Sequence, residues 1–580
     1  MTTPPAQPAG PPAGERAEDT GAEAAGALGP EVTLFTDNDP ALFGQALIAA
    51  ARAAVQHPVA GTSAALRLSA NLVNAGLSTA NRIWGNKAEG PMPVDSKDKR
   101  FADPAWDANP AYWGVRQTYL ALRQYGTDLV RMSDLDPVDR GKAELALSFL
   151  ADAFSPTNFA PTNPAVLKRA FETGGRSLLD GLKNFTDDLL HNDGRPRQVD
   201  ASPFEVGRNL ACTPAKVVYR SRLIEVLQYL PQTKQVHEVP LLLSPPWINK
   251  YYVMDLAPGR SFVEWAVQHG RTVFAISYRN PDASMAGTTM DDYLINGPRA
   301  ALHMVREITG AQKVDLVGLC LGGAITVMTA AYLDAIGEKR INTMTLLNTM
   351  VDFSDPGALG RFTDEASVAK LEKKMAQRGY LEGHEMAGTF DMLRPNDLIF
   401  NYVVSNWLMG KQPPAFDILA WNSDATRMPA AMHSFYLRSC YVKNQFAKGE
   451  LEIAGEQLKL DDVDEDLYVV AAINDHIVPW TSSYATTQHV AGDVRFILSS
   501  GGHIAGIVNP PSPKAWYEVA EQNPETPEQW RHEATRTQAS WWEDWAKWGA
   551  ARAGPKVKPP RIGSDQHPVI GDGPGEYVRM

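Results

Sequence analysis

Cys320 lies at the centre of the pattern G-x-C-x-G in GLCLGG (318–323), between a predicted strand and a predicted helix. In this context the pattern is typical of a nucleophile elbow, with sulfur in place of serine oxygen. The neighbours of a nucleophile in such a strained turn must lack side chains for the turn to close. The helix N-terminus favours thiolate, and the N–H of Leu321 would point at an oxyanion. We therefore predict a nucleophile at Cys320; a structural cysteine is the less favoured alternative.

An acid and a base are expected later in the chain, in loops that follow further strands. Asp475 ends the predicted strand YVVAAIN, and His503 lies in a glycine-rich segment just beyond the predicted strand DVRFILSS. We predict that Asp475 is the acid and His503 the base. His476 is an alternative base, although its position beside the acid favours a supporting role. His433 could approach the site, but we expect it to be a packing residue.

The segment SPPWINKYY (244–252) follows the first clear strand. In this arrangement the corresponding loop gives a second oxyanion N–H, which here would come from Ile248. A rigid Pro-Pro turn describes the same segment and is compatible with that role. Cys212 and Cys440 lack an elbow, and we predict that they are packing residues.

Short apolar runs that alternate with helical stretches indicate the elements that position these residues. Such alternation is typical of an α/β domain with a mostly parallel sheet, here an α/β-hydrolase core. A helix is expected around 291–308 and another after Cys320. The predicted strands are 240–247, 272–278, 313–319, 341–348, 466–475 and 493–500.

Three further segments complete the predicted domain organisation. Residues 1–30 are rich in Pro, Ala and Gly and are expected to be disordered. Residues 31–205 are expected to form a mainly helical N-terminal domain, interrupted by a Gly pair at 174–175. The catalytic domain would span 206–580, and about 352–440 lack a clear strand, which predicts an inserted cap.

Composition limits the partners that we expect. The chain has 55 Lys and Arg against 67 Asp and Glu, a net charge of −12, without the basic cluster that nucleic-acid binding requires. Three cysteines without a CxxC pair indicate neither a disulfide framework nor a cysteine zinc site, and fit a cytoplasmic setting. Neither a signal peptide nor a transmembrane segment is predicted.

Several motifs in their order along the chain resemble class I poly(3-hydroxyalkanoate) synthases, over roughly residues 100–580. They include PPWINKYYVMDL, YRNPDASMAGTTMDDY, RPNDLIFNYVV, FDILAWNSDATRMP, NDHIVPW and GGHIAGIVNPP. The resemblance implies a Cys320–His503–Asp475 triad with oxyanion donors at Leu321 and Ile248. It also associates Trp421 with the dimer or cap region. The sequence departs from the resemblance at Trp247, where other members carry Cys or Gln.

The resemblance implies polymerisation of (R)-3-hydroxyacyl-CoA, such as 3-hydroxybutyryl-CoA, with release of CoA through a cysteine thioester. It implies no cofactor, a homodimer, and association with a growing polyester chain and its cytoplasmic granules. Two alternatives remain open. A cysteine-dependent esterase, thioesterase or polyester hydrolase could use the same triad. A non-enzymatic granule-surface protein could use the tryptophan stripe of SWWEDWAKWGA (540–550), although such a stripe more often packs against its own core.

Overall fold

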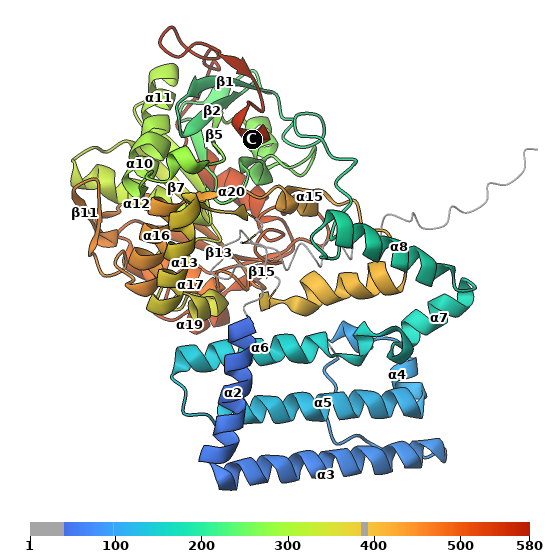
Figure 1. The fold of residues 1–580 in the computed structure, drawn as a ribbon. Helices are drawn as coiled ribbons and strands as arrows, with labels where there is room; N and C mark the ends of the chain where they lie inside the picture. Colours follow the sequence, from blue (N-terminus) through green and yellow to red (C-terminus); the bar gives the residue numbers. More distant parts are fainter. Residues whose placement is uncertain (1–39, 97, 384, 386–391) are drawn as a thin grey trace, which may run out of the picture.

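The computed structural model of the chain describes residues 40–96, 98–383, 385 and 392–580, so the predicted tail at 1–30 lies outside the described residues. Helices come first along the chain, and the sheet follows them. Figure 1 shows the first helices stacked as layers on one side of the sheet-containing part. In the described part of the chain, none of the helices is long and apolar enough to cross a membrane.

The predicted helical N-terminal region is confirmed. Its principal helices are α2 (Pro40–Gln56), α3 (Pro58–Ile83), α5 (Pro110–Arg131), α6 (Pro137–Ala153), α7 (Pro164–Glu172) and α8 (Arg176–His191). Asn109 and Asp136 cap α5 and α6 by accepting backbone N–H groups, and a proline follows each cap. Both signals favour a helix start, since the first N–H groups of a helix lack internal partners. The Gly pair ends α7, because Gly175 adopts a φ of 86°.

An eleven-stranded mixed sheet forms the core of the second part, in the order β15-β14-β13-β12-β7-β6-β4-β5-β2-β1-β17. Its central strands are all parallel, as predicted. These strands are β4 (Leu241–Ser244), β5 (Val273–Tyr278), β6 (Val314–Leu319), β7 (Ile341–Leu347), β12 (Asp466–Ala472) and β13 (Val494–Ser499). Nearly all of their residues are buried, which explains their continuous apolar sequences.

Antiparallel strands extend both edges of the sheet, and we did not predict them. On one side these are β1 (Ala215–Arg220), β2 (Ile224–Tyr229) and β17 (Gly571–Asp572). On the other side are β14 (Tyr517–Val519) and β15 (Thr535–Thr537). Most of these strands are short and partly exposed, so their sequences lack the long apolar run that identifies a central strand.

The prediction of a single helix around 291–308 is wrong, because a kink divides this segment into two helices. The chain forms α10 (Met290–Leu294) and α11 (Ala300–Thr309), with a π-helical turn at 295–299 between them. Gly297 has non-helical angles there, with φ −99° and ψ −111°, and Pro298 follows it. Proline removes a backbone donor and crowds the preceding turn, so the two helices meet at a kink.

The tryptophan-rich segment forms α20 (Trp541–Ala550), and its stripe faces the core. Trp541, Trp542 and Trp545 are fully buried. Their indole N–H groups donate to the carbonyls of Gly506 and Ile507 and to the Thr345 hydroxyl respectively, each over 2.9 Å. The stripe is therefore not an exposed surface for polymer, which removes the observation that supported a non-enzymatic granule-surface protein.

The segment predicted to lack strands contains mostly helices: α13 (Glu365–Arg378), α15 (Asp417–Ser423), α16 (Ala430–Tyr436) and π-helical turns. A two-residue antiparallel pair also occurs there, between β8 (Tyr380–Leu381) and β9 (Met428–Pro429), and was not predicted. The chain re-enters the sheet at β12 after a hairpin of β10 (Leu451–Ile453) and β11 (Glu456–Leu458).

A polar cluster ties the start of this segment to its end. The Asn444 side chain donates to Asp352 Oδ1 over 2.7 Å and accepts the N–H of Phe353 over 2.9 Å. His489 Nε2 lies 3.1 Å from Asp352 Oδ2. The hydrogen bond to Asp352 raises the pKa of His489 against the opposing effect of burial, and the Asp461 charge adds to the increase. The partnership with His489 and Asn444 in turn holds the pKa of Asp352 well below its usual range.

We predict that His489→Gln lowers the thermal midpoint more at pH 6 than at pH 9. A histidine pKa raised on folding stabilises the native state fully below the unfolded value of about 6.5, and this contribution is lost as pH rises through the folded value. Because both side chains are partly exposed, the effect at pH 6 should be about 0.5–1 kcal/mol. Differential scanning calorimetry at both pH values measures it.

His532→Gln is the control, since His532 is an exposed residue of α19 (Pro527–Glu533). That variant should show little change in midpoint at either pH. A His489→Gln deficit of equal size at pH 6 and pH 9 would contradict the ion pair.

Candidate active site

The predicted elbow is formed by β6, Cys320 and α12 (Leu321–Ala335). Cys320 has φ 52° and ψ −114°, a conformation that residues with a side chain seldom adopt. A side chain on Gly322 would overlap the carbonyl of Ser244, and one on Gly323 would overlap the Thr349 hydroxyl. The glycines thus allow the helix to start directly against β4 and β7. The turn is held on the strand side by the N–H of Cys320, which donates to Leu347 over 2.8 Å.

The sheet brings Asp475 and His503 together beside this turn. They follow β12 and β13, which are adjacent and parallel. His503 Nδ1 lies 2.5 Å from Asp475 Oδ2, and neither side chain has exposed area. The other oxygen of Asp475 accepts the N–H groups of Ile477 and Val478 over 2.9 and 3.0 Å. The carboxylate is therefore fixed by the backbone as well as by the imidazole.

His503 is held so that its second nitrogen remains available. Nε2 is buried and has no hydrogen-bond partner among the described residues. The side-chain amide of Asn348 donates to the His503 carbonyl, which fixes the loop after β13 to the end of β7. Burial alone would lower the pKa of His503, but the charges of Asp475 and Cys320 outweigh burial and raise it to about 10. The site therefore stabilises the imidazolium that forms when His503 accepts a proton.

The loop that contains Ile248 lies against the elbow. β4 pairs with β6 so that Ser244 is opposite Gly318, and the backbone of 244–245 contacts Gly322. Ile248 is fully buried four residues beyond the strand. Ile248 and Leu321, the first residue of α12, thus come from two segments that meet at the turn.

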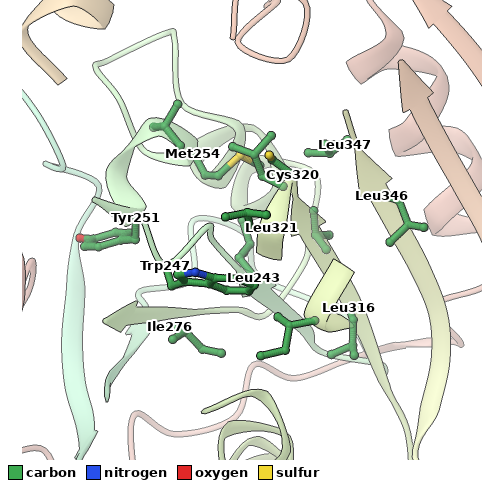
Figure 2. Packing of buried hydrophobic residues seen from close by; sticks show 14 of the residues in the cluster. Leu243, Trp247, Tyr251, Met254, Ile276, Leu316, Cys320, Leu321, Leu346 and Leu347 are labelled. Carbon is green, nitrogen blue, oxygen red and sulfur yellow. The ribbon is translucent and has the colours of Figure 1, made fainter. Parts of the chain in front are cut away.

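Aromatic side chains surround Cys320, which is only 6% exposed. Burial raises the pKa values of Tyr436 and Tyr441, and the nearby Cys320 and Cys440 add to the increase. The Trp247 ring meets the Tyr436 ring edge to face, with centroids 5.6 Å apart. Figure 2 shows Cys320 with Met254, Leu321 and Leu347 around it and Trp247 on the Leu321 side.

Tyr436 and Tyr441 were missed by sequence reasoning. They belong to α16 and the following π-helical turn Leu437–Val442, far from the motif positions. Their one signal in the sequence was the aromatic spacing in SFYLRSCY, and buried π-helical turns often mark functional sites.

The other candidate histidines, His476 and His433, do not pair with Asp475. Asp475 bonds His503 rather than His476, and burial lowers the pKa of His476 to about 4. His433 is fully buried without a hydrogen-bond partner among the described residues, and burial lowers its pKa to about 3. Neither environment favours a protonated imidazole. Trp421, also fully buried, donates its N–H to the carbonyl of Lys250 over 2.8 Å.

The remaining cysteines occupy different surroundings from Cys320. Cys440 is fully buried, and burial raises the pKa of its thiol to about 12. Cys212 is partly exposed. In the described ranges of the chain, no group of three or more His, Cys, Asp or Glu side chains is arranged to hold a metal ion.

A charged cavity of about 1360 Å³ reaches the acid from the outside. Its walls include Lys99, Arg100 and Arg123 from the helical region, Arg394 and Lys411 from the inserted segment, and Asp475. Sequence reasoning did not identify this cavity, because it is formed by segments distant in the chain.

Comparisons with known proteins relate the chain to a known family and fold. Residues 97–266 match the family described as poly-beta-hydroxybutyrate polymerase N-terminus, and 250–510 match the alpha/beta hydrolase fold. The poly(3-hydroxyalkanoate) polymerase of Methylorubrum extorquens is 40% identical, over 96% of this chain and 93% of its own. The polymerase subunit PhaC of Cupriavidus necator is 41% identical, over 86% of each chain.

The corresponding subunit of Rhizobium meliloti is also 41% identical, over 87% of this chain and 83% of its own. The match extends across the helical region as well as the sheet. It therefore relates the whole chain, and not one domain of it, to these polymerases. It confirms the resemblance and the fold class that the motifs predict. The chain belongs to the poly(3-hydroxyalkanoate) polymerase family of acyltransferases.

Proposed function

We propose that this chain polymerises (R)-3-hydroxyacyl-CoA, with a short acyl group such as 3-hydroxybutyryl, and that Cys320 carries the acyl group as a thioester. The observation that carries the proposal is the fully buried Asp475–His503 pair beside a cysteine in an elbow. The names of the relatives support the polymerase activity.

Acylation begins when His503 Nε2 takes the proton of Cys320 and the thiolate attacks the thioester carbonyl. A new C–S bond forms, and the carbonyl oxygen becomes an oxyanion that accepts the N–H groups of Leu321 and Ile248. The bond to CoA then breaks, and His503 returns the proton to the departing thiolate. Asp475 keeps the imidazole oriented and stabilises its positive charge.

Elongation uses the same residues with a different nucleophile. The 3-hydroxyl of another acyl unit gives its proton to His503, and its oxygen attacks the acyl-thioester. A C–O ester bond forms while a C–S bond breaks, which releases a thiolate that takes the proton. No cofactor is required, because the CoA thioester itself supplies the activated acyl group.

A cysteine nucleophile suits this sequence of steps. Exchange between thiol and thioester is nearly isoenergetic, so an acyl-enzyme can persist until the next unit arrives, whereas a serine ester would lie downhill. Burial of Cys320 supports the persistence of the acyl-enzyme, because it limits hydrolysis.

The cavity beside Asp475 has five cationic wall residues of the type that binds phosphate groups, and CoA carries several phosphates; they are Lys99, Arg100, Arg123, Arg394 and Lys411. Five acidic residues line the same cavity, namely Asp95, Asp98, Asp103, Asp397 and Asp475. Membership of the family also supports a homodimer that works at the surface of cytoplasmic polymer granules, which we include in the proposal.

The same residues could support an esterase, a thioesterase or a polyester hydrolase. Incubation of the purified protein with 3-hydroxybutyryl-CoA distinguishes these functions when CoA release and turbidity are followed together. We expect both to rise. CoA release with free 3-hydroxybutyrate and no turbidity would indicate a hydrolase instead.

We predict that Cys320→Ala lowers CoA release by at least about 10³-fold, because no other group can form the acyl-enzyme. The fold should persist, since the turn accommodates a smaller side chain, and circular dichroism checks this. Cys212→Ala is the matched control, as a partly exposed cysteine outside the site, and should retain activity. Turnover of Cys320→Ala at the wild-type rate would rule out the assignment.

We predict that Asp475→Asn impairs elongation more than acylation. A thiol at a helix N-terminus loses its proton readily, whereas an alcohol needs a strong general base. Under single-turnover conditions acyl-enzyme should form within about tenfold of the wild-type rate, while chain growth falls by about 10²–10⁴-fold. Equal losses in both steps would mean that Asp475 only orients His503.

A further inference from the structure

Trp247 has a buried polar group that the proposed mechanism does not use. The residue is 2% exposed, and its indole N–H has no hydrogen-bond partner among the described residues. A buried donor without a partner destabilises the folded state, so such groups in native proteins call for an explanation.

The indole N–H groups of other buried tryptophans in the sheet-containing part do have hydrogen-bond acceptors. Trp421, Trp541, Trp542 and Trp545 each donate to a carbonyl or hydroxyl oxygen at 2.8–2.9 Å. Trp530 shares the lack of a partner, but it packs against Tyr484 and Phe496, away from the elbow.

The position of Trp247 places this donor next to the reacting groups. It immediately precedes Ile248, in the loop whose start contacts Gly322 of the elbow. Its ring packs edge to face on Tyr436, and the Tyr436 hydroxyl is near enough to Cys320 to be influenced by its charge. In Figure 2 Leu321 lies between Trp247 and Cys320, and Ile276 lies on the other side of the Trp247 ring.

Two rings fix the orientation of the indole. Tyr293 contacts it with centroids 6.0 Å apart and an interplanar angle of 67°, and Tyr436 contacts it at 89°. Tyr293 is itself stacked on Tyr278 at 5.5 Å. A donor held this rigidly loses little conformational entropy when a ligand oxygen reaches it, which makes it suitable for selecting a substrate.

We infer that Trp247 is a specificity-determining residue, whose indole N–H donates to the 3-oxygen of the acyl group bound at Cys320. The inference rests on the proposed function and assigns recognition of the 3-hydroxyl of its substrate to Trp247. While the carbonyl oxygen occupies the donors of Leu321 and Ile248, the 3-oxygen lies two carbons further along the chain. A site that hydrogen-bonds a substrate hydroxyl rejects the analogue that lacks it, because its own buried donor is then left unpaired.

The test compares 3-hydroxybutyryl-CoA with butyryl-CoA, which differ only in the 3-hydroxyl. Single-turnover CoA release measures acylation of Cys320 by either substrate, without any need for elongation. Wild-type protein should be acylated by 3-hydroxybutyryl-CoA at least about tenfold more efficiently. Trp247→Phe keeps an aromatic ring and removes the N–H, so it should reduce this preference by about tenfold.

Trp530→Phe is the matched control, since it removes the other buried indole N–H without a partner in the described part of the chain, in a separate cluster with Tyr484 and Phe496. It should leave the preference unchanged. Equal acylation of wild-type protein by the two substrates would overturn the inference even if Trp247→Phe failed to fold. An unchanged preference in folded Trp247→Phe would overturn it as well. Absence of CoA release from both substrates with wild-type protein would instead overturn the proposed function, and this inference with it.

Discussion

The left-handed backbone conformation of Cys320 is the constraint on which the site depends. With φ at 52°, the chain turns from β6 into α12 within one residue and presents the thiol at the carboxyl end of this central strand. This is possible only because Gly322 and Gly323 let the helix start against β4 and β7. The strain of such a turn must be offset by the packing around it, and the parallel strands on both sides provide that packing.

The buried charges of the site are stable only in combination. An isolated carboxylate or imidazolium in the core would be strongly disfavoured, but Asp475 accepts two backbone N–H groups as well as His503. The aromatic residues around Cys320 keep the surroundings apolar, so each charge interacts more strongly with its neighbour than it would in water. The same low polarity makes the free N–H of Trp247 costly to leave unpaired.

The elbow, the central strands and the order of Asp475 and His503 can be predicted from sequence, because each depends on local spacing and on strand order. The surroundings of Cys320 cannot be predicted in this way, since Tyr436 reaches the site through long-range packing of a helical segment. The edge strands lack a continuous apolar run, and the kink at Gly297 was masked by helical periodicity on both sides, although Pro298 was visible. Local spacing and strand order thus identify the proposed reacting groups, while tertiary packing determines which residues surround them.

The hydrogen bonds from α20 have a consequence for the timing of activity during synthesis. Trp541 and Trp542 donate to the carbonyls of Gly506 and Ile507, in the loop that carries His503. A nascent chain on the ribosome exposes the Cys320 elbow long before these tryptophans leave the exit tunnel. Until then the loop lacks the donors that fix its backbone, so the proposed nucleophile is translated well before the proposed base can be held in place. Under the proposed mechanism, acyl groups would not be loaded onto an unfinished chain.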